Sequence, residues 1–410
     1  MSRTKQKVLA FNGGSSSIKF ALYEIGSPMQ PRLTGKIDRI GLSGTTLVFN
    51  DTTRDQQGSL NIDVCDFSSA ANILRDWLEQ HVDFTQVKAV GHRVVHGMQH
   101  TAPELVTRSL LDELHNIISF DPGHLPGEIE LIEVFRRHYP QLPQVACFDT
   151  AFHRNMPRVA RLLPIPRRFD TMGIQRYGFH GLSYAYLMQA LAQVAGPQAA
   201  QGRVILAHLG NGASLAAVHA GQSMDTSMGF TPCGGLAMGT RSGDLDPGVA
   251  WYIMQRENLT SKQFNHLINH ESGLLGMSET SPDMRDLLVQ EAYDVRPAEA
   301  VEVFCYQVKK WIGAFAAAIG GLDTLVFAGG IGEHAPVVRA RICSELEFLG
   351  IEIEEKSNAQ NADVISTETG RVAVRIMHTD EELMIAKSVC GILGLTNQKE
   401  HEYGQQDKSA

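Results

Sequence analysis

The chain lacks a long uninterrupted hydrophobic segment. Its longest apolar run, Ile312 to Leu322, is far shorter than the roughly 20 residues that cross a membrane. Residues 1–7 are basic but lead directly into a short predicted strand, without the apolar core of a signal peptide. We therefore expect no membrane contact and no secretion, and predict a cytoplasmic protein.

An excess of positive charge is also absent. The 410 residues carry 36 Lys and Arg against 45 Asp and Glu, a formal net charge of −9. Duplex binding draws most of its affinity from clustered Lys and Arg, so this balance argues against a nucleic-acid surface. The cysteines contain no CxxC pair, which favours buried free thiols over disulfides or a zinc site. They are Cys65, Cys147, Cys233, Cys305, Cys343 and Cys390.

Several functional motifs are missing or incomplete. No Walker A sequence with a GKS or GKT ending occurs, so any ATP site is not of the P-loop kind. His266 and His270 have helical metal-ligand spacing, but no glutamate of an HExxH motif lies between them. The segment Ser16 to Lys19 matches the SxxK pattern of serine acylating enzymes, yet it leads into a strand instead of opening a helix.

Length and repetition predict two related domains. A chain of 410 residues exceeds what one hydrophobic core usually supports. Residues 8–18 and 205–215 share one pattern, in which an apolar strand, a turn of glycine with small polar residues and a second strand follow one another. The boundary between the two halves is therefore expected near the middle of the chain.

The turns within these two segments suit phosphate binding. Without bulky side chains, backbone N–H groups and hydroxyls can face a common point and surround phosphate oxygens. Ordinary β-hairpins are the alternative, because glycine and serine are common wherever strands reverse. A third glycine turn, residues 329–334, follows the apolar strand 324–328, and three such turns favour a nucleotide.

Strands alternate with helices elsewhere, which predicts an α/β architecture with largely parallel central strands and ligands at their carboxyl ends. A helix capped by Asp66 or Ser68 is expected, and a final helix that begins near Thr379 and ends by Leu393. The other expected strands are 17–25, 144–148 and 204–209, and the other helices are 127–138, 183–194 and 298–319. Residues 397–410 are expected to form a polar tail.

Two arginines are candidates for anion binding. Arg241 lies among small residues, so its guanidinium can hold phosphoryl oxygens in a confined space. An ion pair with Asp244 or Asp246 is an equally good interpretation. Arg93 lies in a strand-like segment where alternation places Val95 on the same face, which suits a short carboxylate with a small tail. Taken by itself, an exposed strand arginine is the simpler account.

Other polar side chains follow strands or open helices. Asp149 comes directly after the strand 144–148, where it could orient a nucleophile, help to hold a metal or cap a turn. His180 could donate to charge that develops on a transferring group, or it could be structural. Thr379 and Glu382 fit a capping box. Glu381 then remains as a candidate outer ligand of Mg²⁺, which favours one or two carboxylates with waters and phosphates.

Together these motifs resemble the acetokinase family, in order and over almost the whole chain, from about Val8 to Leu395. The matching segments are Asn12 to Phe20, Gly91 to Gly97, Phe148 to His153, Arg176 to Gly181, His208 to Gly212, Gly239 to Pro247, Gly329 to Glu333 and Thr379 to Glu382. The resemblance implies a duplicated two-domain actin-like ATPase fold, shared with sugar kinases, heat-shock ATPases and actin, with an interdomain cleft. The expected domains are 1–149, completed by a helix at 384–395, and 150–383, with 396–410 as the tail.

The resemblance also assigns roles to residues. Arg93, Asp149, His180 and Arg241 would be catalytic, and Asn12 and Glu381 would belong to the metal site. Arg93, Val95, Gly123, His124, Phe179 and Pro232 would bind the carboxylate substrate. The nucleotide would be bound by Lys19, His208, Leu209, Gly210, Asn211, Gly212, Asp283, Met284, Arg285, Gly330, Ile331, Gly332, Glu333 and His334.

The implied reaction is reversible, Mg²⁺-dependent phosphoryl transfer from ATP to acetate, giving ADP and acetyl phosphate, in a homodimer; Mn²⁺ is a possible substitute. Phosphoryl transfer relies on alignment and charge neutralisation, which two arginines and a metal supply. Gly123 and Leu125 depart from the family's usual leucine and asparagine, so propionate or another short acid is an alternative substrate. His334 replaces the usual asparagine. A noncatalytic nucleotide-binding switch is the rival from another class.

Overall fold

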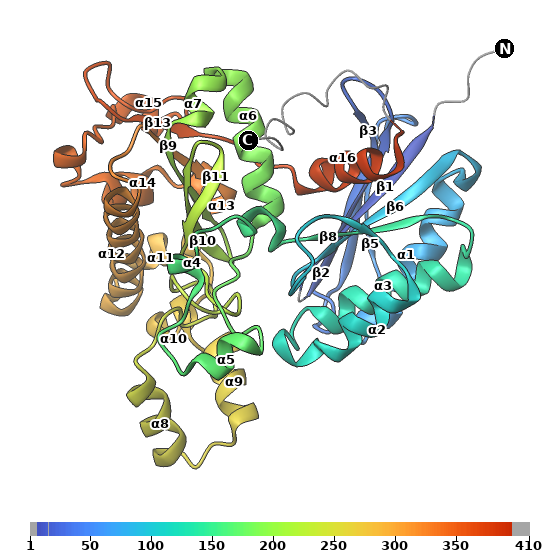
Figure 1. Cartoon of the computed structure of the whole chain (residues 1–410), viewed down its shortest axis with the longest axis horizontal. Coiled ribbons are helices and arrows are strands. Elements are labelled where there is room, and N and C mark those ends of the chain that lie inside the picture. The colour runs from blue at the N-terminus through green and yellow to red at the C-terminus, as the bar shows by residue number, and fades with distance from the viewer. Residues whose placement is uncertain (1–5, 15, 396–410) are drawn as a thin grey trace. The chain divides into compact units, whose positions relative to one another are not determined.

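The computed structural model describes residues 6–14 and 16–395, and the expected polar tail lies outside these ranges. The chain divides into two compact units (Figure 1). Unit 1 contains residues 1–151 and 380–410, and unit 2 contains Phe152–Thr379. Each unit has its own mixed sheet, so each is described by itself.

Unit 1 is built on a sheet with the strand order β5-β4-β3-β2-β1-β6-β8-β7. The strands β1, β6 and β8 are parallel neighbours, whereas β1 to β5 pair antiparallel in succession. The strands are β1 (Lys7–Gly13), β2 (Ser17–Glu24), β3 (Gln30–Asp38), β4 (Thr46–Asp51), β5 (Gln56–Asn61), β6 (Val87–Val94), β7 (Glu104–Leu105) and β8 (Gln144–Phe148).

Helices cover both faces of this sheet. On one face, α1 (Phe67–His81) and α3 (Leu125–His138) share a core with Leu9, Phe11 and Phe20, and α2 (Arg108–Asn116) packs on α3. On the other face lies α16 (Glu381–Leu393), whose approach requires a glycine, because a Cβ on Gly91 would lie 2.4 Å from Ile385 Cγ2. The last helix of the chain therefore packs on the first part of the fold.

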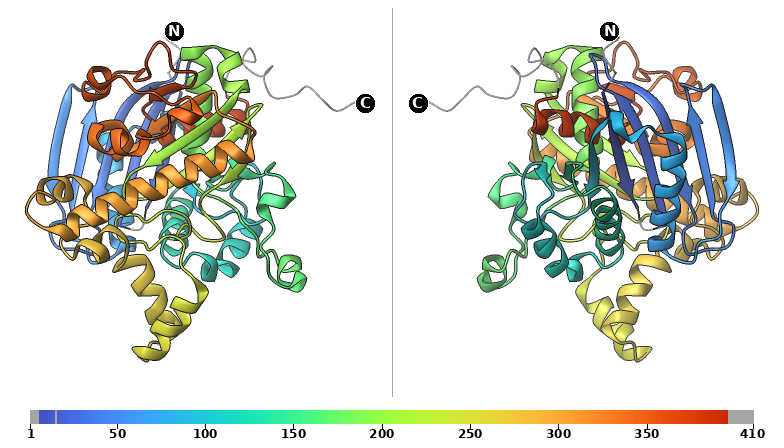
Figure 2. Two further views of the ribbon diagram at one scale, coloured as in Figure 1. Left: turned by 90° about the vertical axis from the view of Figure 1, so that its left-hand side faces the viewer. Right: turned by 90° about the vertical axis from the view of Figure 1, so that its right-hand side faces the viewer.

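Unit 2 has the strand order β11-β10-β9-β12-β13. Here β9 (Arg203–Leu209), β12 (Thr324–Ala328) and β13 (Ala373–Ile376) are parallel, and β10 (Ala213–His219) and β11 (Gln222–Thr226) pair antiparallel. The long helix α12 (Val295–Ala318) contacts β9 and β10 (Figure 2). On the opposite face α6 (Gly181–Ala195) packs on Val204 and Leu206.

Shorter helices fill the connections of unit 2. They are α4 (Arg158–Arg161), α5 (Arg167–Thr171), α7 (Pro197–Gln201), α8 (Pro247–Arg256), α9 (Ser261–His270), α10 (Gly273–Ser278), α11 (Met284–Gln290), α13 (Gly329–His334), α14 (Pro336–Cys343) and α15 (Glu355–Ala359). Within the described residues of the chain, no helix is both long and apolar enough to span a membrane.

The two sheets repeat one plan, which confirms the predicted duplicated α/β fold. The hairpin β1–β2 followed by parallel β6 and β8 corresponds to the hairpin β9–β10 followed by parallel β12 and β13. The expected parallel strands are these two triplets, and outside them the strands from β1 to β5 and from β9 to β11 pair antiparallel because each hairpin reverses the chain. The third glycine turn also differs, since residues 329–334 form the helix α13 directly after β12.

The predicted helices occur with shifted ends. Asp66 caps α1 by accepting from Ser69 N. The proposed capping box of Thr379 and Glu382 was wrong: Asp380 is the N-cap of α16 and its carboxylate accepts from Leu383 N, while the Thr379 hydroxyl donates to Ser183. Among the cysteines, Cys65 is exposed and the other five are buried, and all six are free thiols.

Candidate active site

Arg93 is held at the carboxyl end of the parallel strands of unit 1. Its Nη2 and Nε atoms donate to Asp149 Oδ2 at 2.6 and 3.1 Å, and Nη1 donates to the Gly13 carbonyl at 2.7 Å. Glu128 of α3 lies 3.4 Å from Nη1. The Arg93 side chain is 11% exposed and both carboxylates are buried. The interpretation of Arg93 as an exposed strand arginine is therefore wrong.

Burial and charge act against each other in this cluster. Burial opposes the charge on Arg93, but the carboxylates of Asp149, Glu128 and Glu381 outweigh it and raise the pKa of the guanidinium. Burial raises the pKa of Glu128 to about 8, although Arg93 and the hydrogen bond from Val95 N act in the opposite direction. Arg93 is consequently a fixed cation, and Glu128 is easily protonated.

Val95 lies just beyond the end of β6, with its side chain buried and its N–H donating to Glu128 Oε2 at 2.8 Å. Gly123 and His124 lie in the turn before α3. Both backbone N–H groups donate to Asp121, and His124 Nδ1 lies 3.0 Å from the same carboxylate. Gly123 is exposed, and a Cβ there would meet only Asp121 Oδ1, at 3.6 Å. A larger side chain at position 123 therefore has room.

Asn12, at the end of β1, meets the first turn of α16. Its Nδ2 donates to Glu381 Oε2 at 2.7 Å and to Glu382 Oε1 at 2.8 Å. Burial raises the pKa of Glu382, whereas Lys19, an exposed residue of β2, acts to lower it. One amide and two carboxylates suit a Mg²⁺ ion that keeps waters and phosphates as further ligands. No group of three or more His, Cys, Asp or Glu among residues 6–14 and 16–395 could hold a metal by itself.

His180 and Arg241 gather around Gly212 in unit 2. A Cβ on Gly212 would lie 3.4 Å from His180 Nε2 and 3.8 Å from Arg241 Nη1. His180 is the N-cap of α6 with a left-handed φ of 59°, its Nδ1 lies 2.8 Å from Ser214 Oγ, and its ring centroid is 4.3 Å from that of His208. Ring and guanidinium are thus brought to the small space above a glycine.

Arg241 is positioned by backbone as well as by sulfur. Its Nη1 donates to the Pro232 carbonyl at 3.2 Å and lies 3.8 Å from Met238 Sδ. The carboxylates offered as alternative partners have other roles: Asp244 accepts from Gly235 N, and Asp246 caps α8. Phe179 precedes His180, and its ring is buried in unit 2 while its carbonyl accepts from His153 Nε2.

The predicted nucleotide segments of unit 2 meet at the carboxyl ends of β9 and β12. Ala328 pairs with His208 in register, which places the turn Leu209–Gly212 beside the start of α13 at Gly330 and Ile331. Gly210 N donates to the Gly212 carbonyl, and Gly239 N donates to the Asn211 carbonyl. A Cβ on Gly239 would lie only 2.3 Å from Asn211 Oδ1. The surface of this turn therefore consists mainly of backbone groups.

The other predicted nucleotide residues have clear structural roles. Asp283 caps α11 and binds the exposed guanidinium of Arg285, while Met284 is buried. Glu333 accepts from Gly329 N at 2.9 Å and lies 3.0 Å from His378 Nδ1; burial acts to raise its pKa, but His378 lowers it overall. Gly332 is buried in α13, and His334 is exposed.

Sequence reasoning missed three residues of these clusters. Glu128 could have been found, because it shares the apolar helical face of Ile132 and Phe135. Glu382 was taken for a cap. Ser214, whose Oγ lies 2.8 Å from His180 Nδ1 and 2.5 Å from Tyr184 Oη, gave no signal beyond its place in a glycine turn.

Several known proteins are similar to this chain in sequence and in structure. The acetate kinase of Rhodopseudomonas palustris is 42% identical over 93% of this chain and 97% of its own length. The propionate kinase of Citrobacter rodentium is 41% identical over 94% of this chain and 96% of its own. The crystal structure of Porphyromonas gingivalis acetate kinase aligns with a TM-score of 0.84 and 35% identity, covering 95% of this chain and all of that one.

The sequence profile of the acetokinase family matches residues 7–387 of this chain. The match takes in both sheets, the Arg93 cluster, the group around Gly212 and the first turn of α16. The chain therefore belongs to the acetokinase family, which makes it a phosphotransferase with a carboxyl group as acceptor.

Proposed function

We propose that this protein transfers a phosphoryl group reversibly between ATP and acetate, producing ADP and acetyl phosphate, with Mg²⁺ as the metal. The observation that carries this proposal is the convergence of His180 and Arg241 on the space above Gly212. A guanidinium and an imidazole at one point suit the equatorial oxygens of a phosphoryl group in transfer. The names of the relatives favour the same reaction.

In unit 1, Arg93 is the proposed carboxylate-binding residue. Asp149 holds its guanidinium through two hydrogen bonds and Glu128 lies beside Nη1, so the cation is positioned before substrate arrives. The substrate carboxylate is ionised at neutral pH and needs no strong general base. Asp149 acts here by orienting Arg93, and Val95 and His124 are the proposed apolar and polar neighbours of the acid.

In unit 2, the turn His208 to Gly212 is the proposed phosphate-binding segment. Its small residues expose backbone groups beside His180, and Gly330 adjoins them at the start of α13. Asp283, Met284 and Arg285, with Ile331 to His334, are proposed to hold the adenosine. Lys19 of unit 1 is proposed to contact the nucleotide phosphates.

Asn12 and Glu381 are the proposed metal-site residues, and Glu382 joins them on the same amide. Oxygen ligands suit Mg²⁺, and Mn²⁺ as a substitute. When bound, the ion would neutralise phosphate charge. The protein's own contribution is to hold two carboxylates at a fixed distance from Asn12.

The choice of acid depends on Gly123. Because this residue is exposed and its Cβ position is nearly open, a leucine would fit there, and its absence would leave more room for an acyl chain. Propionate is therefore the second candidate substrate, and the 41% sequence identity to the propionate kinase of Citrobacter rodentium supports it. We further propose a cytoplasmic homodimer; the exposed Trp251 and Tyr252 on α8 are apolar groups that a second copy could cover.

The roles of the two arginines are tested by replacing each with alanine. Arg241→Ala should lower phosphoryl transfer at least about a hundredfold while ATP still binds in a calorimetric titration. Arg93→Ala should instead raise the KM for the acid. Transfer at the wild-type rate in the Arg241 variant would refute the proposal.

A further inference from the structure

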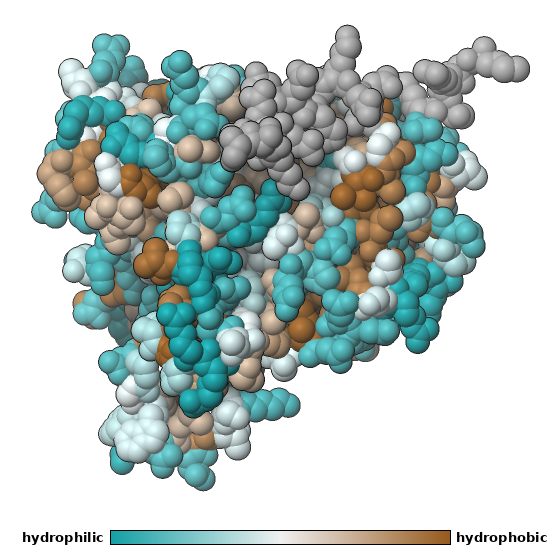
Figure 3. Space-filling model, in the orientation of Figure 1, coloured by the Kyte–Doolittle hydropathy of each residue, from teal (hydrophilic) through white to brown (hydrophobic). Residues whose placement is uncertain are grey.

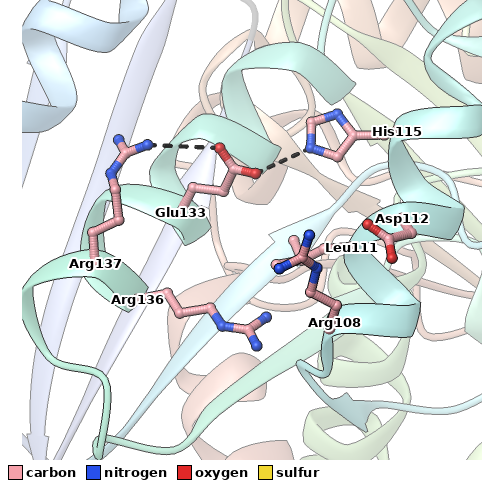
Figure 4. Close-up of a pocket in the computed structure, with 7 residues that line it drawn as sticks. All are labelled: Arg108, Leu111, Asp112, His115, Glu133, Arg136 and Arg137. Atoms are coloured by element: carbon pink, nitrogen blue, oxygen red, sulfur yellow. Dashed lines mark hydrogen bonds and ion pairs between the residues drawn. The ribbon is translucent and has the colours of Figure 1, made fainter.

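A basic pocket lies between α2 and α3 of unit 1, outside every cluster described above. It has a volume of about 460 Å³ and is lined by Arg108, Leu111, Asp112, His115, Glu133, Arg136 and Arg137 (Figure 4). Cavities of this size accommodate small molecules. The surface over α2 and α3 is mainly hydrophilic (Figure 3), so an apolar partner does not suit it.

The charges of this pocket are unequally compensated. Glu133 already has two partners, since its Oε1 lies 3.0 Å from His115 Nε2 and its Oε2 lies 3.8 Å from Arg137 Nη1. Arg137 also reaches Glu130 at 3.1 Å. Glu133 is therefore paired across α2 and α3 with His115 and within α3 with Arg137, and these ion pairs involve neither Arg108 nor Arg136.

Arg108 and Arg136 differ from Glu133 and Arg137 in the contacts of their charged groups. Among the residues that the structure describes, neither guanidinium has a hydrogen-bond or ion-pair partner, and Nη1 of Arg136 is buried. In Figure 4 the two guanidinium groups reach toward the same part of the pocket, from α2 and from α3. A buried donor without a partner is costly, and so is the approach of two like charges.

The position of Arg108 adds a second cost. It is the first residue of α2, directly after the N-cap Thr107, where the helix dipole disfavours a cation. Asp112, one helical turn later, could relieve it through an i, i+4 pair worth no more than a few tenths of a kcal/mol. That pair would still leave Arg136 without a partner.

We propose that this pocket is a binding site for a small anion that carries two or more phosphate groups. A guanidinium donates a planar fork of N–H groups that matches phosphate oxygens, and two forks from neighbouring helices select an anion with more than one such group. The carboxylates of Asp112 and Glu133 and the small number of cations disfavour a long nucleic acid at this place. The site is separate from the arginines proposed for transfer.

The test is a calorimetric titration of the full-length protein with inorganic pyrophosphate in 0.15 M salt, in which binding at the nucleotide site is fitted as a separate site that the pocket variants leave unchanged. Arg108→Ala and Arg136→Ala should each weaken pyrophosphate binding at least tenfold. Arg108 is exposed, so its variant should keep the wild-type unfolding transition even if the Arg136 variant does not. Arg54→Ala, which removes a cation elsewhere in unit 1, is the matched control and should leave the affinity unchanged.

Asp112→Asn supplies a change of opposite sign. Removing this carboxylate eliminates its repulsion of the anion, so pyrophosphate should bind more tightly than to the wild type. The inference is overturned if the wild type shows no site beyond the nucleotide site, if Arg108→Ala binds like the wild type, or if Arg54→Ala weakens binding as much as Arg108→Ala.

Discussion

Arg93 lies near the end of β6 and Asp149 directly follows β8, its parallel neighbour, and a single carboxylate oxygen of Asp149 accepts hydrogen bonds from both Nε and Nη2 of Arg93. The pair is almost removed from water, since the arginine is 11% exposed and the aspartate 0%. In such surroundings the loss of one partner leaves the other charge uncompensated. We therefore expect Asp149 to fix the orientation of the Arg93 guanidinium.

Asp149→Asn should lower both stability and activity. The free energy of unfolding should fall by about 3 kcal/mol, because Arg93 loses its closest counter-charge in a buried place. The kcat/KM for the acid should fall about tenfold or more, through a higher KM, as the guanidinium loses its orientation. Urea unfolding and steady-state kinetics measure the two effects.

The matched control is Asp76→Asn. Asp76 also pairs with an arginine, Arg75, but its own side chain is 58% exposed. Its removal should change the free energy of unfolding by no more than about 1 kcal/mol. Equal effects of the two substitutions would contradict the importance assigned to the buried pair.

Glu128 should make stability depend on pH. Its pKa is raised from 4.5 to about 8, so the folded protein binds a proton there that the unfolded chain releases. The stabilisation from this group is fully present below pH 4.5 and is lost as the pH rises through about 8. The wild type should therefore lose stability relative to Glu128→Gln between pH 5 and about 8, as measured by urea unfolding. A stability difference between the two proteins that stays constant over this range would show that the pKa is not shifted, and a wild type that gains stability relative to Glu128→Gln as the pH rises would show a shift in the opposite direction.

Gly212→Ala should impair transfer without harming the fold. The new methyl group would lie 3.4 Å from His180 Nε2, in the space proposed for the phosphoryl group. We expect kcat/KM to fall about tenfold or more, with an unchanged thermal transition. Gly313→Ala is the control. A Cβ there meets nothing within 4 Å, so activity should be unaffected. The free energy of unfolding should rise by about 0.5–1 kcal/mol, because alanine favours the helical conformation of α12.

Ser214→Ala should lower kcat and leave the KM for ATP nearly unchanged. The hydroxyl lies 2.8 Å from His180 Nδ1 and orients the ring, so its loss affects the transition state more than substrate binding. A tenfold fall in kcat is the expected scale. Tyr184→Phe removes only the second contact of this hydroxyl and should have a smaller effect. A rise in KM alone would assign Ser214 to binding instead.

Local patterns predicted much of this fold correctly. The hairpins at residues 8–18 and 205–215 were recognisable because alternating apolar residues and glycine turns determine them locally. The strands 144–148 and 324–328 matched to the residue, since each is a continuous buried run. The grouping of His180, Arg241 and Gly212 was expected only from family resemblance.

The errors occurred where the contacts of a side chain depend on residues that are distant in the sequence. The helix at 381–393 was predicted to begin with Thr379 as its cap, but Asp380 supplies the cap, and Asn12 engages Glu382. Glu128 of α3 was overlooked because its role depends on Arg93, which reaches it from the strand β6. No local pattern contains these contacts.

The central claim is that a carboxylate accepts the phosphoryl group of ATP. The most direct measurement incubates the protein with ATP, Mg²⁺ and acetate, propionate or butyrate, and determines acyl phosphate and ADP in the same samples. We predict equal amounts of acyl phosphate and ADP with acetate, and turnover with propionate as well. A preference of more than tenfold for propionate, about 1.4 kcal/mol in transition-state binding, would reassign the acid. ADP without acyl phosphate from any of the three acids would contradict the account.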